Sequence, residues 1–115
     1  MKQKAVDAYT GKGGQRVNCA QAVARAAKDA YGVTEAEIDA YASCGGGRAP
    51  GGVCGAIHAA HEIIARKSSS DADTAILEFE RTIGALGCSE IKSAKKRSCL
   101  DCVAEAAMLA EKFAK

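Results

Sequence analysis

Residues 44–61 read CGGGRAPGGVCGAIHAAH and separate two series of helical segments. This stretch holds six of the twelve glycines, the only proline, two of the six cysteines and both histidines. Glycine loses more freedom than other residues on folding, so we expect a loop here, followed by a helix from near Val53. Cys54 then lies in the first helical turn, where exposed N–H groups favour a reactive or metal-binding thiolate. The alternative without a function is a simple interhelical loop followed by a buried core residue, Cys54.

Upstream of this stretch, capping residues and apolar residues at helical spacing predict three helices. The expected segments are 2–10, then 19–31 between an Asn18 cap and Gly32, then 35–43 behind the capping box of Thr34 and Glu37. Cys19 therefore lies in the first turn of its helix and is expected to face inward.

Downstream, the pattern predicts further helices over about 53–67, about 72–86 behind Asp71 or Asp73, and 99–113 behind Ser98. Cys88 is expected in a turn just past a helix that Gly87 ends. No segment alternates with a period of two. The fold class is therefore all-α, an antiparallel helical bundle of four main helices plus one or two short helices, formed as a single domain over 1–115.

Composition excludes several classes of function. A net charge of +2 is too small to indicate binding to nucleic acid or to an anionic membrane, and no stretch is apolar enough to span a bilayer. The N-terminal residues lack the apolar run of a secretory signal, so we expect a cytoplasmic protein. Structural disulfides are rare in that compartment, and six cysteines then indicate metal binding or redox chemistry.

The cysteines share a position in the expected helices. Cys19, Cys54 and Cys99 each lie in the first turn of an amphipathic helix, and Cys88 lies in a turn between two helices. Four such thiols from separate segments can converge at one end of a bundle. Cys99 and Cys102 form a single Cys-x-x-Cys pair, which matches neither the paired spacing of zinc sites nor the cysteine runs of bacterial ferredoxins.

Two other groups are secondary candidates. Cys54, His58 and His61 recur at i, i+4 and i+7, which places them on one helix face as a potential metal-ligand set. We favour the interpretation that both histidines are simply partly exposed. The basic run of Lys92, Lys95, Lys96 and Arg97 is interpreted as a solvated loop, with a docking patch for an acidic electron-transfer partner as the alternative.

The chain also resembles the C_GCAxxG_C_C family of "putative redox-active" proteins over about Ala5 to Ala110. The resemblance rests on Asn18 to Val23, Gly45 to Gly47, Gly52 to Ala56, Gly87-Cys88, and Cys99 with Val103. It implies that the four family cysteines are Cys19, Cys54, Cys88 and Cys99, with Cys44 and Cys102 as additions. One departure is Ala59, where the family motif has glycine.

Three functions stay open. Four thiolates from Cys19, Cys54, Cys88 and Cys99 could hold an iron–sulfur cluster for electron transfer, which is the function we favour. Alternatively, cysteine pairs cycle between dithiol and disulfide, or the same thiolates bind structural zinc in an interaction module. The sequence does not identify a substrate, the redox partner protein, or whether the subunit pairs with a copy of itself.

Overall fold

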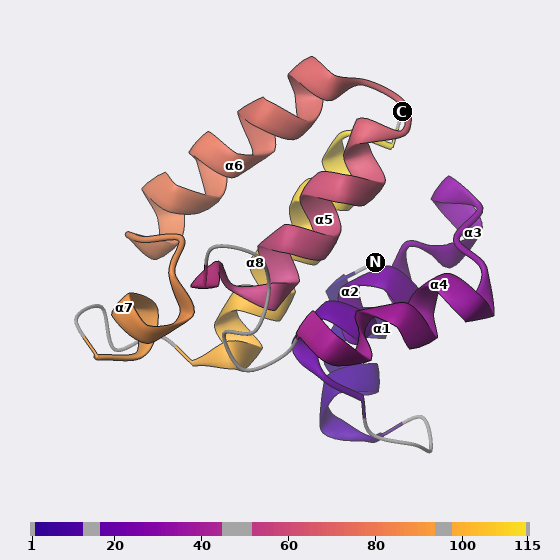
Figure 1. Ribbon diagram of the computed structural model, residues 1–115, viewed down its shortest axis with the longest axis horizontal. Helices are drawn as coiled ribbons and strands as arrows, with labels where there is room; N and C mark the ends of the chain where they lie inside the picture. The colour runs from indigo at the N-terminus through magenta and orange to yellow at the C-terminus, as the bar shows by residue number, and fades with distance from the viewer. Residues whose placement is uncertain (1, 13–16, 45–51, 94–97, 115) are drawn as a thin grey trace.

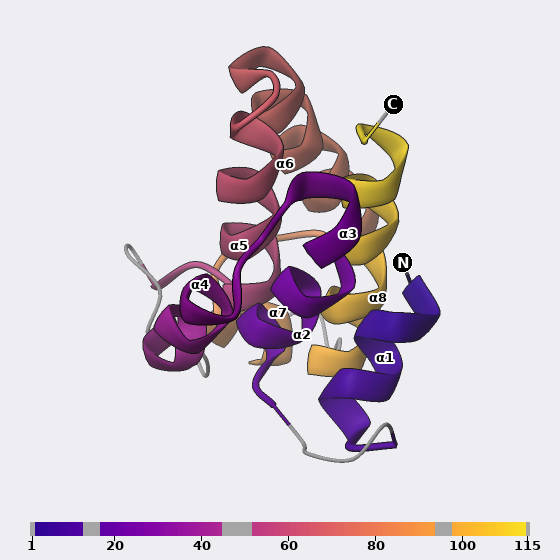
Figure 2. The same cartoon turned by 90° about the vertical axis from the view of Figure 1, so that its right-hand side faces the viewer.

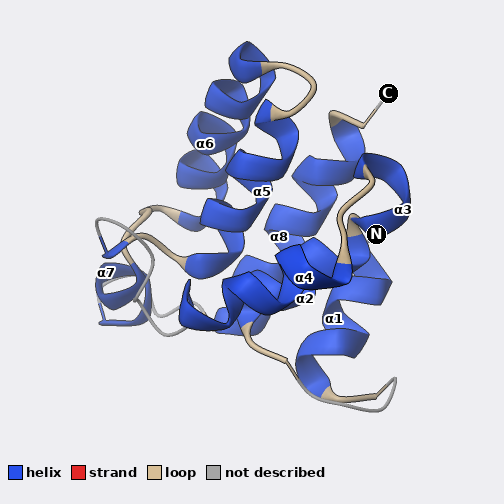
Figure 3. Ribbon diagram, turned by 45° about the vertical axis from the view of Figure 1, so that its right-hand side comes forward, coloured by secondary structure: helices blue, strands red, loops and turns tan. Residues whose placement is uncertain are grey.

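The computed structural model describes residues 2–12, 17–44, 52–93 and 98–114, except the side chains of Cys88, Ser89 and Lys92. Within these residues the chain consists of helices and connecting loops (Figures 1 and 3). The described residues form no strand, and their one extended pairing is an isolated antiparallel bridge between Val53 and Gly87. The all-α fold class is therefore confirmed.

The helices differ in number and length from those expected. In chain order they are α1 (Lys2–Thr10), α2 (Cys19–Ala26), α3 (Lys28–Tyr31), α4 (Glu35–Ala40), the 3₁₀ helix η1 (Tyr41–Cys44), α5 (Gly55–Ala65), α6 (Ser69–Ile83), α7 (Cys88–Ser93) and α8 (Cys99–Lys112). Helices α5, α6 and α8 run side by side, and α1, α2 and α4 gather across one end of them (Figures 1 and 2). The described part therefore contains more short helices than expected, and the antiparallel four-helix bundle stays a prediction.

The capping residues identified in the sequence start three of the helices. Asn18, Thr34 and Ser98 each accept a hydrogen bond from the third residue of their helix, whose side chain bonds back to the cap. These reciprocal bonds satisfy N–H groups that have no partner within the helix. Gly32 ends α3 with a φ of 69°, a left-handed conformation that costs glycine little.

Both ends of α6 were predicted wrongly. Ser68, and not Asp71 or Asp73, is the N-cap of α6, and its hydroxyl accepts a bond from the Asp71 N–H. At the other end Gly84 ends the helix in the left-handed region, three residues before Gly87. The Val53–Gly87 bridge explains the early end, because it holds this segment in extended conformation against the residues before α5.

The same pairing moves two cysteines from their expected positions. The Cys54 N–H donates to the Leu86 carbonyl at 2.7 Å, so Cys54 is the N-cap of α5, and the helix itself begins at Gly55. Cys88 opens α7 directly after the bridge, whereas the sequence placed it in a turn. The expected helix over 19–31 is interrupted at Ala27, although the Tyr31 N–H still donates to the Ala27 carbonyl.

Helix α5 lies at the centre of the packing and contacts α2, α6 and α8, while α1 covers α2 and α8. Its apolar face includes the fully buried Ile57, Ile63 and Ile64, and Phe79 of α6 is the largest fully buried side chain. Most other core positions are alanines, whose small side chains allow the helices to approach closely. Among the described residues, no helix is long and apolar enough to cross a membrane.

Candidate functional site

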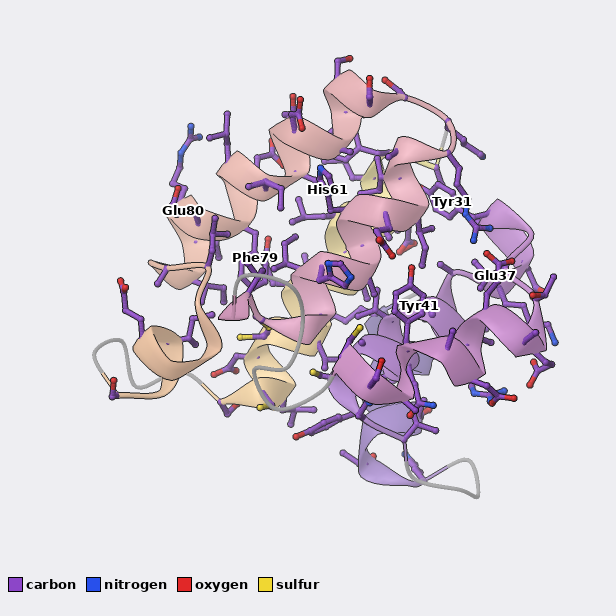
Figure 4. The ribbon with its side chains drawn as sticks, viewed as in Figure 1. Tyr31, Glu37, Tyr41, His61, Phe79 and Glu80 are labelled. Carbon is purple, nitrogen blue, oxygen red and sulfur yellow. The ribbon has the colours of Figure 1, made fainter. Side chains whose placement is uncertain are left out.

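The cysteines of different helices gather at one end of α5 and α8, where Figure 4 shows the sulfur atoms close to the first turns of these helices. Cys19 is the first residue of α2, Cys54 caps α5, and Cys102 lies one turn into α8. All three are buried, whereas Cys44 and Cys99 are half-buried. Helices α2, α5 and α8 thus contribute thiols to one region.

Gly55 is the point where three of these segments meet. A Cβ atom placed on Gly55 would lie 2.5 Å from the Cys44 carbonyl oxygen and 2.9 Å from the Cys19 Sγ. Both distances are shorter than real Cβ contacts, so only glycine allows this approach. The Cys19 sulfur therefore lies directly against the first residue of α5, next to Cys54.

Asn18 connects the start of α2 to η1. Its side-chain oxygen accepts from the Gln21 N–H at 2.8 Å, which caps α2. Its amide nitrogen donates to the Tyr41 and Ala42 carbonyls, each at 3.1 Å. One side chain thus positions both Cys19 and the helix that ends at Cys44.

Asn18→Ala is expected to lower the free energy of unfolding by about 1–3 kcal/mol, because it removes a cap and two hydrogen bonds to η1. Asn18→Ser is the matched control, since serine keeps a capping oxygen but cannot donate to both carbonyls. Urea denaturation of the three proteins measures the difference. Equal stability of wild type and Asn18→Ser would contradict a role for the amide in fastening η1.

Cys54 and Cys102 interact directly through their side chains. The hydrogen bond to Cys54 raises the pKa of the Cys102 thiol, followed by burial and by the negative charges of Cys54, Cys99 and Asp101. Cys102 therefore keeps its proton and donates it toward the Cys54 sulfur.

The predicted four-cysteine metal site is only partly described. The antiparallel bridge of Val53 with Gly87 places Leu86 opposite Cys54 and Cys88 opposite Gly52, and the Cys88 side chain lies outside the described residues. Among the side chains that are described, no group of three or more His, Cys, Asp or Glu residues is arranged to hold a metal ion. The ligand set of Cys19, Cys54, Cys88 and Cys99 therefore stays a prediction.

The family model described as "Putative redox-active protein (C_GCAxxG_C_C)" matches residues 17–113, which is most of the chain. The chain belongs to this C_GCAxxG_C_C family. No curated protein and no solved structure matches it significantly. The matched region includes all six cysteines. It also includes every helix described above except α1.

In this member of the C_GCAxxG_C_C family, the two histidines of α5 have different neighbours. The His58 Nε2 is 3.7 Å from the Glu62 Oε1, and its ring makes an edge contact with Tyr41 at 6.2 Å between centroids. The His61 Nε2 is 3.4 Å from the Asp73 Oδ1 on α6. Both histidines are partly buried, and among the described side chains they form no group with Cys54 that could hold a metal ion.

The sequence did not reveal two features of this site. The Cys54–Cys102 contact joins residues far apart in the chain, so no local pattern in the sequence predicts it. The second feature is the carboxylate beside each histidine. Glu62 lies one turn after His58 on α5, and Asp73 reaches His61 because α6 packs against α5. The proposed docking patch cannot be described, because Lys95, Lys96, Arg97 and the Lys92 side chain lie outside the described residues.

Tyr41 makes the site region sensitive to alkali. Burial raises the pKa of Tyr41 above its ordinary value of 10.0, and the hydrogen bond to Glu62 and the charges of Glu62 and Cys44 raise it further. The folded state therefore resists ionisation of this phenol. The stability that Tyr41 contributes in its protonated form is fully present below pH 10.0, its ordinary pKa. It is lost as the pH rises from there toward the raised pKa of the folded state.

Tyr41→Phe is thus expected to flatten the loss of stability above about pH 10, by about 1.4 kcal/mol per pH unit. Urea denaturation between about pH 9 and 11 measures this slope, and titration of the other groups is common to both proteins. An unchanged slope would mean that Tyr41 ionises equally well in the folded and unfolded states.

Proposed function

We propose that this protein is a thiol–disulfide redox protein whose working cysteines are Cys54, Cys99 and Cys102. The observation that supports this function best is the hydrogen bond between the Cys54 and Cys102 side chains. Two thiols whose side chains interact directly can form a disulfide where their Cα atoms lie within about 7 Å of each other. The charge of Cys99 also acts on Cys102, so the three thiols form a continuous series.

The half-buried Cys99 is the thiol that meets the partner. It is the first residue of α8, behind the Ser98 cap, and it is more exposed than the buried Cys54 and Cys102. The Cys99 thiolate attacks a disulfide of the partner protein, forms a mixed disulfide and releases one partner thiol. Cys102 then passes its proton to the neighbouring Cys54 sulfur and attacks Cys99, which forms the Cys99–Cys102 disulfide and releases the second partner thiol.

Cys54 receives the oxidising equivalents inside the protein. Its thiolate attacks the sulfur of Cys102, so that a Cys54–Cys102 disulfide forms and Cys99 is free again. The balance is two protein thiols oxidised for one partner disulfide reduced to two thiols. A cytoplasmic location would keep all three cysteines reduced until a disulfide partner arrives.

The test is disulfide mapping by mass spectrometry after the reduced protein is exposed to a protein disulfide such as oxidised thioredoxin. We expect Cys54–Cys102 or Cys99–Cys102 peptides, and we expect Cys102→Ser to abolish both. Cys44→Ser is the matched control and should leave these peptides unchanged. Free Cys54, Cys99 and Cys102 after full exposure would refute the dithiol function.

A second function, the iron–sulfur cluster, is favoured by a different observation. Cys19, Cys54 and Cys99 open or cap three helices that pack together, and Cys88 directly follows Gly87, which pairs with the residue before Cys54. With Cys88 these residues would supply four thiolates, the number that cysteine-ligated clusters need. Cys102 would then act only as a hydrogen-bond donor to the Cys54 sulfur, a contact that tunes a cluster's potential.

Anaerobic purification distinguishes the two functions. A cluster would give visible absorption with iron and sulfide, whereas structural zinc on the same thiolates would be colourless but detected by metal analysis. Serine replacement of Cys19, Cys54, Cys88 or Cys99 should then remove the metal, and Cys102→Ser should retain it. A colourless protein without metal under these conditions would exclude both forms of metal site.

A further inference from the structure

A cavity of about 380 Å³ lies between the segment of α4 and η1 and the helix α5. Figure 4 shows Glu37 and Tyr41 on the α4 and η1 side of this region. The polar groups that line the cavity come from both sides of it and are Glu37, Tyr41, Cys44, His58, Glu62 and Arg66. Its volume falls in the range of small-molecule sites and is far too small for a protein partner.

The lining carries charges of both signs. The Arg66 guanidinium pairs with the Glu37 carboxylate across the gap between α5 and α4. On the other side, the Tyr41 hydroxyl donates to the Glu62 Oε1 at 2.7 Å, and the His58 Nε2 lies 3.7 Å from the same oxygen. Tyr41 itself is buried and positions Glu62. A ligand that fits such a lining carries both a carboxylate and an ammonium group.

The cavity also contains a thiol that the proposed dithiol function leaves unused. Cys44 is half-buried and belongs to the lining, and its charge acts on Tyr41. The Cys44 carbonyl faces Gly55, which lies next to Cys54 in the cysteine cluster. Cys44 is also outside the four cysteines that the family resemblance singles out. The cavity therefore combines a thiol, Cys44, with the ion pair of Arg66 and Glu37.

We propose that this cavity binds a small zwitterionic disulfide and forms a mixed disulfide with it at Cys44. The ligand's carboxylate meets Arg66 and its ammonium group meets Glu62. The Cys44 thiolate attacks one ligand sulfur, the S–S bond breaks, and the other half leaves as a thiol after taking up a proton. This site does not require the exchange among Cys54, Cys99 and Cys102, so either proposal can fail alone.

The experiment compares two disulfides, cystine and the uncharged bis(2-hydroxyethyl) disulfide. Reduced protein is exposed briefly to each, acid-quenched and digested, and the rate of modification is read on the peptide that contains Cys44. We expect cystine to modify Cys44 about tenfold faster than the neutral disulfide, the effect of one charge-assisted hydrogen bond. Arg66→Gln should reduce this ratio to near one, because it also leaves Glu37 to repel the carboxylate.

Three comparisons keep the test decisive. Glu62→Gln, on the other side of the cavity, should lower the ratio of the cystine rate to the neutral-disulfide rate, as Arg66→Gln does. If Arg66→Gln does not fold, Glu62→Gln takes its place in the test. Arg81→Gln changes an exposed arginine outside the lining and should leave the ratio intact. Cys102→Ser should also leave it intact, since only the dithiol function needs Cys102. Equal rates for the two disulfides, or a ratio that survives both cavity variants, would overturn the proposal.

Discussion

Gly55→Ala is expected to lower the free energy of unfolding by about 1–3 kcal/mol and to disturb the cysteine cluster at the same time. The added methyl would lie 2.5 Å from the Cys44 carbonyl oxygen and 2.9 Å from the Cys19 Sγ. The sulfur can rotate away, but the carbonyl belongs to the backbone of η1 and moves only with that helix. The start of α5 therefore separates from η1, and Cys19 loses its present position.

Gly87→Ala is the matched control for this prediction. Gly87 lies in the bridge to Val53, close to the same end of α5, yet a Cβ there would be 3.9 Å from its nearest neighbour. Urea denaturation should show a clear loss for Gly55→Ala and a small change for Gly87→Ala. The reaction rate of Cys19 with a thiol reagent should rise only in the first variant. Similar stability of both variants would contradict the close approach of α2, η1 and α5.

Phe79→Ala is expected to cost about 3–5 kcal/mol, the largest loss of stability predicted for this chain. Phe79 is fully buried on α6, in a core where about half of the described buried hydrophobic residues are alanines. Alanine side chains cannot extend to fill the space that a lost phenyl ring leaves. For a domain whose total stability is about 5–15 kcal/mol, the variant approaches the limit of folding at ambient temperature.

Leu77→Ala on the same helix provides the comparison. Leu77 is 61% exposed. Its replacement should change the free energy of unfolding by less than about 0.5 kcal/mol, as measured by the same urea titration. A loss at Leu77 comparable to that at Phe79 would mean that the burial of α6 is assigned to the wrong face.

The sequence predicted those parts of the fold that local chemistry determines. Asn18, Thr34 and Ser98 are recognisable caps because each acts on residues within its own first turn. Gly32 could likewise be identified as a helix end from its position after an apolar repeat. The all-α class followed from these signals together with the absence of any period-two segment.

Long-range contacts explain what the sequence did not predict. The start of α5 at Gly55 and the end of α6 at Gly84 both depend on the pairing of Val53 with Gly87, which no local pattern encodes. The gathering of cysteines at helix N-termini was predicted. The direct partner of Cys54 was not, because it depends on how α8 packs against α5.

The packing of α2 and α5 against α8 has a consequence for how the protein is made. Cys19 and Cys54 leave the ribosome well before the helix that contains Cys102, which α2 and α5 need as a packing partner. Synthesis of the 48 positions from Cys54 to Cys102 takes about 2–10 seconds. During that interval the nascent thiols are accessible to metal ions, disulfides and chaperones, before the last helix covers them.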